Sequence, residues 1–196
     1  KNVEPHAKIA LTGECADEIF GGYPWFFRQD ALNSGTFPWS IATSERQTLL
    51  HPSIAKKLDL KGYIDYRYNE CLEQVEILDT DSLETAEKRK ISYLTLNWFM
   101  PTLIDRSERM SMYNGFEIRV PFCNYRLAQY VWNIPWEIKA LNGREKGLLR
   151  YVARKYLPPE IVDRKKSPYP KTHNPTHLAK VKSMLSDIMA NPRAPI

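Results

Sequence analysis

The sequence is short of cysteine, has no long apolar run, and lacks the glycine-rich loops that usually hold nucleotide phosphates. Its three cysteines, Cys15, Cys71 and Cys123, show neither a metal-binding spacing nor a disulfide framework, which favours a reducing, cytoplasmic compartment. No stretch approaches the ~20 consecutive apolar residues of a transmembrane helix, and the polar residues after Lys1 are unlike a signal peptide. The sequence therefore argues against a disulfide-stapled module and a helical membrane protein.

The composition is that of a globular domain with a basic final third. The 196 residues include 43% apolar and 12% aromatic residues, enough for the core of one domain or most of one. The net charge is +5, and many of the lysines and arginines lie within residues 144–182. Because apolar residues such as Leu148, Leu149 and Val152 interrupt them at helical spacing, a solvated helix face is favoured over a nucleic-acid surface. We expect neither a nucleic-acid nor a membrane partner.

Apolar periodicity predicts a mostly helical chain with one clear strand, the buried run Ile9–Leu11. Turn residues make 29–44 a predicted loop, and 167–173 another. The predicted helices cover residues 63–78, 82–100, 105–114, 124–132, 143–156 and 174–188, with short helical turns from Ser44 and at Pro158–Pro159.

Several boundaries carry capping signals. Asp81 with Glu84 is placed as a capping box, and Asn124 and Asn174 each precede a predicted helix. Pro101 is expected to kink the chain or to start a new helix. The four histidines form no recognisable catalytic or metal-binding group, so we expect them at the surface.

The most informative stretch is KIALTGECADEIFGGYPWF, residues 8–26. Its apolar strand ends at Gly13, and Glu14, Asp17 and Glu18 follow before the pair Gly21-Gly22. Carboxylates just past a strand end lie where open α/β sheets bind ligands, and a glycine turn lets the backbone approach one. Three acids in five residues repel one another unless they share a cation or a basic partner. The pattern predicts a metal–phosphate site; the alternative is an acidic cluster at a helix start.

This stretch resembles the second sequence block of the asparagine synthetase family, in its ATP-using synthetase domain. The matching residues are Thr12, Gly13, Glu14, Asp17, Glu18, Gly21, Gly22 and Tyr23. Two further blocks follow in order: residues 110–122 resemble the segment ending Glu-x-Arg-Val-Pro-Phe, and residues 145–166 resemble the closing Lys-x-x-Leu-Arg, Leu-Pro and Arg-x-Lys block. The chain departs from the pattern at Cys15, where glycine is commoner, and at Cys123-Asn124, where Leu-Asp is common. The resemblance spans roughly residues 5–170.

The resemblance implies an α/β fold, the adenine-nucleotide α-hydrolase-like synthetase domain, of which residues 1–196 are the C-terminal, predominantly helical portion with few strands. The chain opens almost directly into a strand, which alone cannot satisfy its edges, so we expect a longer protein. The family's Ser-Gly-Gly-x-Asp-Ser phosphate-binding loop and its glutaminase domain are absent from the sequence. We therefore expect the fragment alone to be inactive.

The family is a carbon–nitrogen ligase that adenylates the side-chain carboxylate of aspartate and then displaces AMP with ammonia from glutamine. An anion attacks a polyanion, so positioning and charge neutralisation carry the chemistry. The resemblance implies ATP and Mg²⁺ as cofactors, and aspartate, glutamine-derived ammonia and the rest of the polypeptide as partners; it leaves a homodimer open. The alternatives are a β-lactam synthetase-like enzyme acting on another carboxylate, and a non-catalytic basic helical binding module.

The resemblance also implies roles for the acidic block. Asp17 is expected to bind Mg²⁺ at the pyrophosphate. Glu14 is expected to be catalytic, orienting substrate or handling the proton lost by ammonia. Glu18 either supports the nucleotide site or is a helix-cap acid. Gly13 is expected to lie against the nucleotide because it has no side chain.

Basic residues of the last block complete the implied site. Lys166 aligns with the family's catalytic lysine, and Lys165 is the alternative register; a compact ammonium there stabilises the transferring phosphate. Lys146 matches the lysine of Lys-x-x-Leu-Arg, where a phosphate contact and a structural ion pair are equally open. Glu117 and Arg119 are interpreted as a brace for a buried segment.

Overall fold

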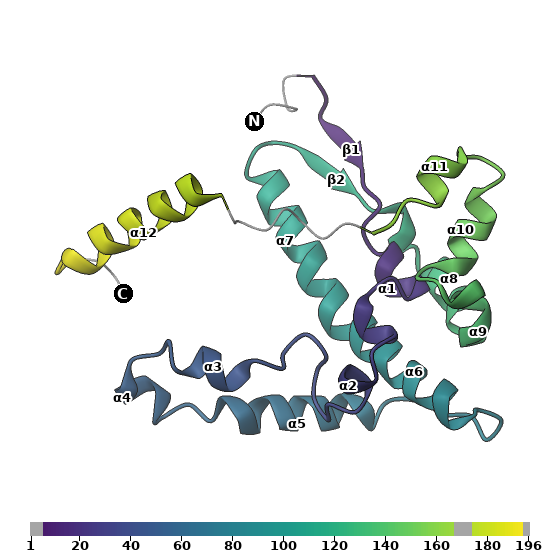
Figure 1. Cartoon of the computed structure of the whole chain (residues 1–196), viewed down its shortest axis with the longest axis horizontal. Helices are drawn as coiled ribbons and strands as arrows, with labels where there is room; N and C mark the ends of the chain where they lie inside the picture. Colours follow the sequence, from purple (N-terminus) through teal and green to yellow (C-terminus); the bar gives the residue numbers. More distant parts are fainter. Residues whose placement is uncertain (1–5, 167–173, 194–196) are drawn as a thin grey trace. The chain divides into compact units, whose positions relative to one another are not determined.

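The computed structural model describes residues 6–166 and 174–193. They belong to two compact units, Lys1–Leu157 and Pro158–Ile196. Helices make up most of both, as Figure 1 shows, and a small two-stranded sheet lies in the first unit. The predicted mostly helical fragment with few strands is confirmed.

The sheet consists of β1 (Ile9–Leu11) and β2 (Glu117–Arg119). The α-helices of the first unit are α1 (Ala16–Phe20), α2 (Gln29–Leu32), α3 (Thr43–Gln47), α4 (Pro52–Ala55), α5 (Leu60–Leu72), α6 (Leu83–Leu94), α7 (Met100–Met112), α8 (Tyr125–Trp132), α9 (Trp136–Lys139) and α10 (Gly147–Ala153). Shorter turns are η1 (Pro24–Phe26), η3 (Pro121–Cys123) and η4 (Leu141–Gly143), and η2 (Thr95–Phe99) is a π-helix. The second unit contains α11 (Pro159–Val162) and α12 (Pro175–Ala190). Within the described residues, no helix is both long and apolar enough to span a membrane.

The two strands pair in parallel, with Ile9 opposite Glu117 and Leu11 opposite Arg119. The strand at Ile9–Leu11 was predicted, but its burial was not borne out: Ile9 is 43% and Leu11 is 72% exposed. Only β2 lies beside β1 among the described residues, so these side chains have little around them. The second strand was missed because three residues ending before a proline carry almost no alternating pattern.

The predicted brace formed by Glu117 and Arg119 is also corrected. Their side chains form an ion pair of 2.6 Å along β2, but both are about half exposed. An exposed pair of this kind contributes little to stability. It does not brace a buried segment among the described residues.

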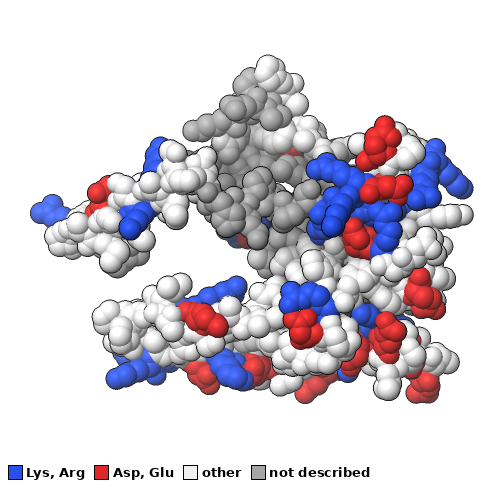
Figure 2. Space-filling model, viewed as in Figure 1, with Lys and Arg blue, Asp and Glu red and all other residues white. Residues whose placement is uncertain are grey.

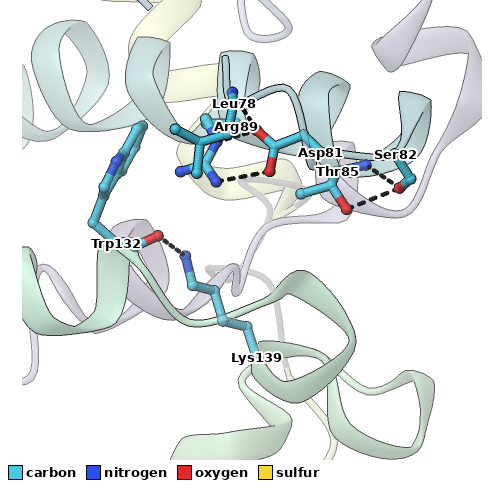
Figure 3. Close-up of polar contacts among 7 residues, drawn as sticks. All are labelled: Leu78, Asp81, Ser82, Thr85, Arg89, Trp132 and Lys139. Carbon is cyan, nitrogen blue, oxygen red and sulfur yellow. Dashed lines mark hydrogen bonds and ion pairs between the residues drawn. The ribbon is translucent and has the colours of Figure 1, made fainter. Parts of the chain in front are cut away.

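The start of α6 differs from its prediction by one residue. Ser82, not Asp81, caps the helix and accepts a hydrogen bond of 3.2 Å from the Thr85 backbone N–H. Asp81 instead forms a two-point ion pair with Arg89, as Figure 3 shows, at 2.8 and 3.0 Å. The preceding helix α5 ends at Leu72, well before the predicted Leu78.

The long helical segment around Pro101 is built from three pieces. Helix α6 passes into the π-helix η2, and α7 then begins with Pro101 in its first turn, where a missing N–H costs nothing. Of the two predicted outcomes, Pro101 therefore starts a helix. Ile91, Leu94 and Thr95 are buried, which confirms that the later half of α6 and its continuation lie in the core.

Two apolar clusters hold the first unit together. One contains buried Cys15, Ile19, Phe20 and Val131, and the other contains Phe37, Cys71 and Leu94. The first cluster joins α1 to α8 and α10, and α1 also contacts η2. The acidic stretch is therefore anchored through the apolar side chains of α1, and its carboxylates are not part of this cluster.

Irregular stretches and helix ends were predicted less well. Within the predicted loop 29–44 the structure forms α2, and α4 was also missed, because helices of four residues carry no periodic signal. Helix α10 begins at Gly147, after the predicted Gly143, because Lys146 adopts a left-handed conformation. Asn124 and Asn174 cap α8 and α12 as predicted. The predicted loop 167–173 lies outside the described residues.

The charged surface of the first unit mixes both signs. Figure 2 shows basic and acidic side chains side by side over α5 and α6. In the basic segment, Lys146 pairs with Asp17 and Arg150 pairs with Glu145, at 2.7 and 2.9 Å. These two cations are part of the fold, so that part of the segment is not the solvated helix face that was favoured.

Candidate active site

The acidic residues are placed by a strand-to-helix turn. After β1, the Thr12 N–H continues the ladder by donating to the Arg119 carbonyl at 3.0 Å. The chain then turns, and α1 starts with Asp17 and Glu18 in its first turn. Carboxylates at a helix start are favoured by the helix dipole, and the end of a parallel strand is a common ligand position. The predicted strand and turn are thus confirmed. The acidic residues lie at a helix start, and the metal–phosphate site stays a prediction.

Cys15 makes that turn in an unusual conformation. Its φ is 74°, in the left-handed region that costs a residue with a Cβ about 1–2 kcal/mol. This is the position where the family commonly has glycine, which adopts such angles freely. The side chain is buried against Ile19, Phe20 and Val131. Cys15 therefore combines a buried, packed side chain with a strained backbone conformation.

The burial of the Cys15 thiol argues against a role as a nucleophile. Burial raises its pKa well above the usual value, and the neighbouring Cys123 thiol and the carboxylates of Glu18 and Glu14 raise it further. Only a thiolate attacks or binds metal, so a thiol held neutral acts as a small apolar group. The two family departures lie beside each other: Cys15 is buried in the core, and the partly buried Cys123 packs against that cluster.

Glu14 is held from α7. The Ser107 hydroxyl lies 2.8 and 2.7 Å from the two carboxylate oxygens of Glu14, and shares its hydrogen between them. The Arg106 guanidinium adds a charge 3.8 Å from Oε1. These contacts fix the carboxylate plane while leaving the side chain 24% exposed. Neither Ser107 nor Arg106 was predicted, since nothing in the sequence relates α7 to the acidic block.

Asp17 forms an ion pair with Lys146. The ammonium Nζ lies 2.7 Å from Oδ1, and both side chains are about one quarter exposed. Of the two roles left open for Lys146, the structure shows the ion pair. Lys146 reaches Asp17 from a left-handed position, with φ of 54°, directly before α10. The expected basic partner of the acidic cluster is therefore Lys146.

The paired glycines are required by their surroundings. A Cβ on Gly22 would lie 1.9 Å from Asp17 Oδ1 and 2.9 Å from its Cα. Gly21 has φ of 69°, and a Cβ there would lie 2.6 Å from the Trp136 ring. The pair ends α1 and lets the next residue pass close to the Asp17 carboxylate. No other residue type fits both positions without movement.

Glu18 lies behind the turn, not in the open. It is 2% exposed and accepts a hydrogen bond from the Tyr23 hydroxyl. Burial raises the pKa of Tyr23 strongly, and the bond to Glu18 adds to this, so the phenol stays a donor. Tyr23 stacks on Trp25 with ring centres 4.2 Å apart. This arrangement matches a supporting role for Glu18.

The remaining predicted residues fall into two groups. Gly13 has open space around it: a Cβ built there meets no heavy atom within 4 Å. Lys165 and Lys166 lie in the second unit, after α11. Lys166 was expected to complete one site with the acidic block. Because the two belong to different units, this stays a prediction.

Comparison with known proteins identifies the family. The Asparagine synthase family model matches residues 1–196, the whole chain. The chain belongs to the asparagine synthase family. Its relative in Bacillus subtilis (strain 168), asparagine synthetase [glutamine-hydrolyzing] 3, is 50% identical over 180 residues. That match covers 92% of this chain and 29% of the relative, so the chain spans less than a third of the relative's length.

More distant relatives differ in name. Asparagine synthetase [glutamine-hydrolyzing] 1 of B. subtilis is 27% identical over 202 residues, covering 87% of this chain and 32% of the relative. Amidase chyE of Penicillium rubens is 23% identical over 214 residues, covering 83% of this chain and 32% of the relative. In both cases the match covers about a third of the relative's length.

Asparagine synthetases use ATP, and the sequence predicted Mg²⁺ as the ion that accompanies it. Among the described residues, no three His, Cys, Asp or Glu side chains gather as a metal site. Mg²⁺ bound to substrate phosphates needs only one or two protein carboxylates, because phosphate and water complete its shell. Asp17, a hard oxygen donor that is partly exposed, fits that requirement.

Proposed function

We propose that the protein containing this chain is a glutamine-hydrolysing asparagine synthetase. It adenylates the side-chain carboxylate of aspartate with ATP, releases pyrophosphate, and uses ammonia from glutamine to give asparagine and AMP. The observation that carries the proposal is the 50% identity, over 92% of the chain, to a relative bearing that name. The acidic turn after β1 supports it, because its carboxylates and lysine lie together.

We infer that the rest of the polypeptide completes the site. It would supply the phosphate-binding loop, the glutaminase domain and further strands of an α/β sheet of the adenine-nucleotide α-hydrolase type. Two observations support this: the chain spans 29% of its relative, and the apolar side chains of Ile9 and Leu11 are exposed on β1. We propose that the described residues supply the acidic half of the site, so the fragment alone is expected to be inactive.

The described residues suggest how the site handles charge. Asp17 would hold Mg²⁺, which when bound neutralises the phosphates and the leaving pyrophosphate. Lys146 adds a positive charge beside Asp17, which lowers the repulsion between the acidic turn and a polyanion. Glu14, held in one orientation by Ser107, is suited to orient the substrate or take a proton from ammonia. Gly13 leaves room for the nucleotide beside the backbone.

Lys166 is proposed as the second cation of the site. An ammonium near the transferring phosphate stabilises charge that develops as pyrophosphate leaves. The support is the position of Lys166 in the Arg-x-Lys motif, with Lys165 as the alternative. Replacing each lysine by methionine in the complete protein distinguishes the two registers. The variant that lacks the catalytic lysine loses most of the enzyme's activity, and the other variant keeps it.

The substrate is tested by ATP–pyrophosphate exchange. The complete protein is incubated with ATP, labelled pyrophosphate and a panel of carboxylates that includes aspartate, glutamate and a β-amino acid. Exchange with aspartate supports the proposal. Exchange only with another carboxylate would support the proposed adenylation reaction but show that aspartate is not the substrate.

We propose a cytoplasmic protein that does not bind nucleic acid. Cys15, Cys71 and Cys123 are free thiols in the structure, as expected in a reducing compartment. The basic-module alternative predicts salt-dependent binding to an oligonucleotide. Binding of a labelled oligonucleotide at low salt by the complete protein tests it, and the absence of binding removes it.

A further inference from the structure

A cavity of about 300 Å³ lies in the first unit beside α6, the loop before it and the α8–α9 turn. Its lining includes Asp81, Lys88 and Arg89 on one side and Trp132 and Lys139 on the other. Figure 3 shows Lys139 extending from α9 toward the Trp132 carbonyl, with Asp81 and Arg89 opposite. None of the residues proposed above for adenylation lines this cavity.

Lys139 is the unusual residue of the cavity. It is only 7% exposed, and its ammonium donates one hydrogen bond, of 3.3 Å, to the Trp132 carbonyl. A lysine ammonium has three hydrogens to donate. In the part of the chain that the structure describes, no carboxylate lies within ion-pair distance of it. A buried charge in this position is costly unless an anion accompanies it.

The neighbouring groups do not supply that anion. Asp81 is engaged by Arg89 through both of its oxygens, at 2.8 and 3.0 Å. Glu137 also lines the cavity but is an exposed residue. Arg89 is close enough to oppose the charge on Lys139: burial lowers the pKa of Lys139 to about 8, and repulsion from Arg89 contributes. At neutral pH Lys139 is still largely charged.

A second buried lysine adds to the positive character. Lys88 is 6% exposed and donates to the Phe26 carbonyl. Burial lowers the pKa of Lys88, and Glu84 partly opposes this. The charged groups that line the cavity are therefore Lys88, Arg89, Lys139, Asp81 and Glu137. Arg89 and Asp81 balance each other, which leaves two lysines and the exposed Glu137.

We propose that this cavity binds a carboxylate or phosphate-type oxyanion, with Lys139 as its principal charged contact. The remaining ammonium hydrogens of Lys139 donate to the anion, and Lys88 adds attraction at longer range, since the charge of Arg89 is balanced by Asp81. The source is either a small free anion or a carboxylate side chain from another part of the complete polypeptide. The site is separate from the proposed adenylation site and does not depend on it.

The first experiment uses the complete protein labelled with 5-fluorotryptophan. The ¹⁹F resonance of Trp132 is assigned with Trp132→Phe and followed while inorganic phosphate is added at constant ionic strength. A free-anion site predicts a saturable shift of this resonance. In Lys139→Met the apparent affinity falls at least about tenfold, because a charge-assisted hydrogen bond is lost. Lys139→Arg keeps the cation and retains most of the affinity.

A second arm detects an anion that the protein itself supplies. If phosphate causes no shift, the wild-type protein is treated with a carbodiimide, which joins an amine to a contacting carboxylate, and the products are mapped by mass spectrometry. A crosslink from Lys139 to a carboxylate outside residues 1–196 supports the internal source. The proposal is overturned if phosphate causes no shift and no such crosslink is found. It is also overturned if phosphate causes the same shift in Lys139→Met as in the wild type. If Lys139→Met does not fold, Lys139→Gln takes its place.

Discussion

Lys146 Nζ lies 2.7 Å from Asp17 Oδ1, and this ion pair links the start of α10 to the acidic turn of α1. Lys146→Met would remove this cation from a partly buried carboxylate, at a cost of about 1–3 kcal/mol. If adenylation depends on this geometry, aspartate-dependent ATP–pyrophosphate exchange falls about 10- to 100-fold. The matched control is Lys155→Met, because Lys155 is an exposed lysine just beyond α10.

A double-mutant cycle distinguishes the effect of this ion pair on the exchange rate from a general loss of stability. In a double-mutant cycle with Asp17→Asn, residues in contact couple by about 0.5–3 kcal/mol. The two single changes are therefore expected to be far from additive in exchange rate. Additive losses would show that Lys146 and Asp17 act independently, contrary to the contact.

Ser107 is expected to hold Glu14 for reaction. Ser107→Ala removes the hydroxyl that lies 2.8 and 2.7 Å from the carboxylate oxygens, so Glu14 can rotate. We expect kcat for asparagine formation to fall about tenfold, the size of one lost hydrogen bond to a charged group, with little change in KM for ATP. Ser107→Thr, which keeps the hydroxyl, should recover most of the rate. A KM change without a kcat change would count against a positioning role.

Cys15 provides a test of backbone strain. Alanine normally stabilises a chain relative to glycine, but φ of 74° is unfavourable for any residue with a Cβ. Both Cys15→Gly and Cys15→Ala lose the buried sulfur, so their difference reports the backbone. We expect Cys15→Gly to be the more stable variant by about 1 kcal/mol. Equal thermal midpoints, or a more stable alanine variant, would mean that the turn is not left-handed in solution.

The pKa of Lys139 makes stability depend on pH. Its folded-state pKa is about 8, below the ordinary lysine value. Between these two pH values the unfolded chain binds more protons, so stability rises with pH. Below pH 8 the buried charge of Lys139 lowers the free energy of unfolding by up to about 3 kcal/mol. This loss decreases as the pH rises and is gone above the pKa of lysine in the unfolded chain.

Lys139→Met removes this term. Relative to the wild type, the variant is expected to be more stable at pH 7 than at pH 10, measured as the difference in thermal midpoint in phosphate-free buffer. Lys155→Met should show no such trend, because that side chain is exposed. A difference that does not change between the two pH values would show that Lys139 titrates normally.

The sequence was sufficient for local features with strong chemical signals. The strand before the acidic block, the caps at Asn124 and Asn174 and the mostly helical character were all predicted and are confirmed. Each depends on a few adjacent residues, so it can be recognised without the rest of the fold. The paired glycines after the acidic block also proved necessary, because their neighbours leave no room for a Cβ.

Contacts between distant segments could not be predicted in the same way. Ser107 reaches Glu14 from α7, and Lys139 lines a cavity with Arg89, although each pair is far apart in the sequence. Such contacts depend on how helices pack, which no local pattern encodes. The burial of β1 was predicted wrongly: Ile9 and Leu11 are exposed, and β2 is its one neighbouring strand among the described residues.

The most direct test of the central claim is the Mg²⁺ dependence of aspartate-driven ATP–pyrophosphate exchange in the complete protein, compared with Asp17→Asn. If Asp17 binds the ion that accompanies pyrophosphate, the variant loses at least about 100-fold in exchange at a fixed Mg²⁺ concentration, and higher Mg²⁺ recovers part of it. Exchange at the wild-type rate with an unchanged Mg²⁺ dependence would contradict the account.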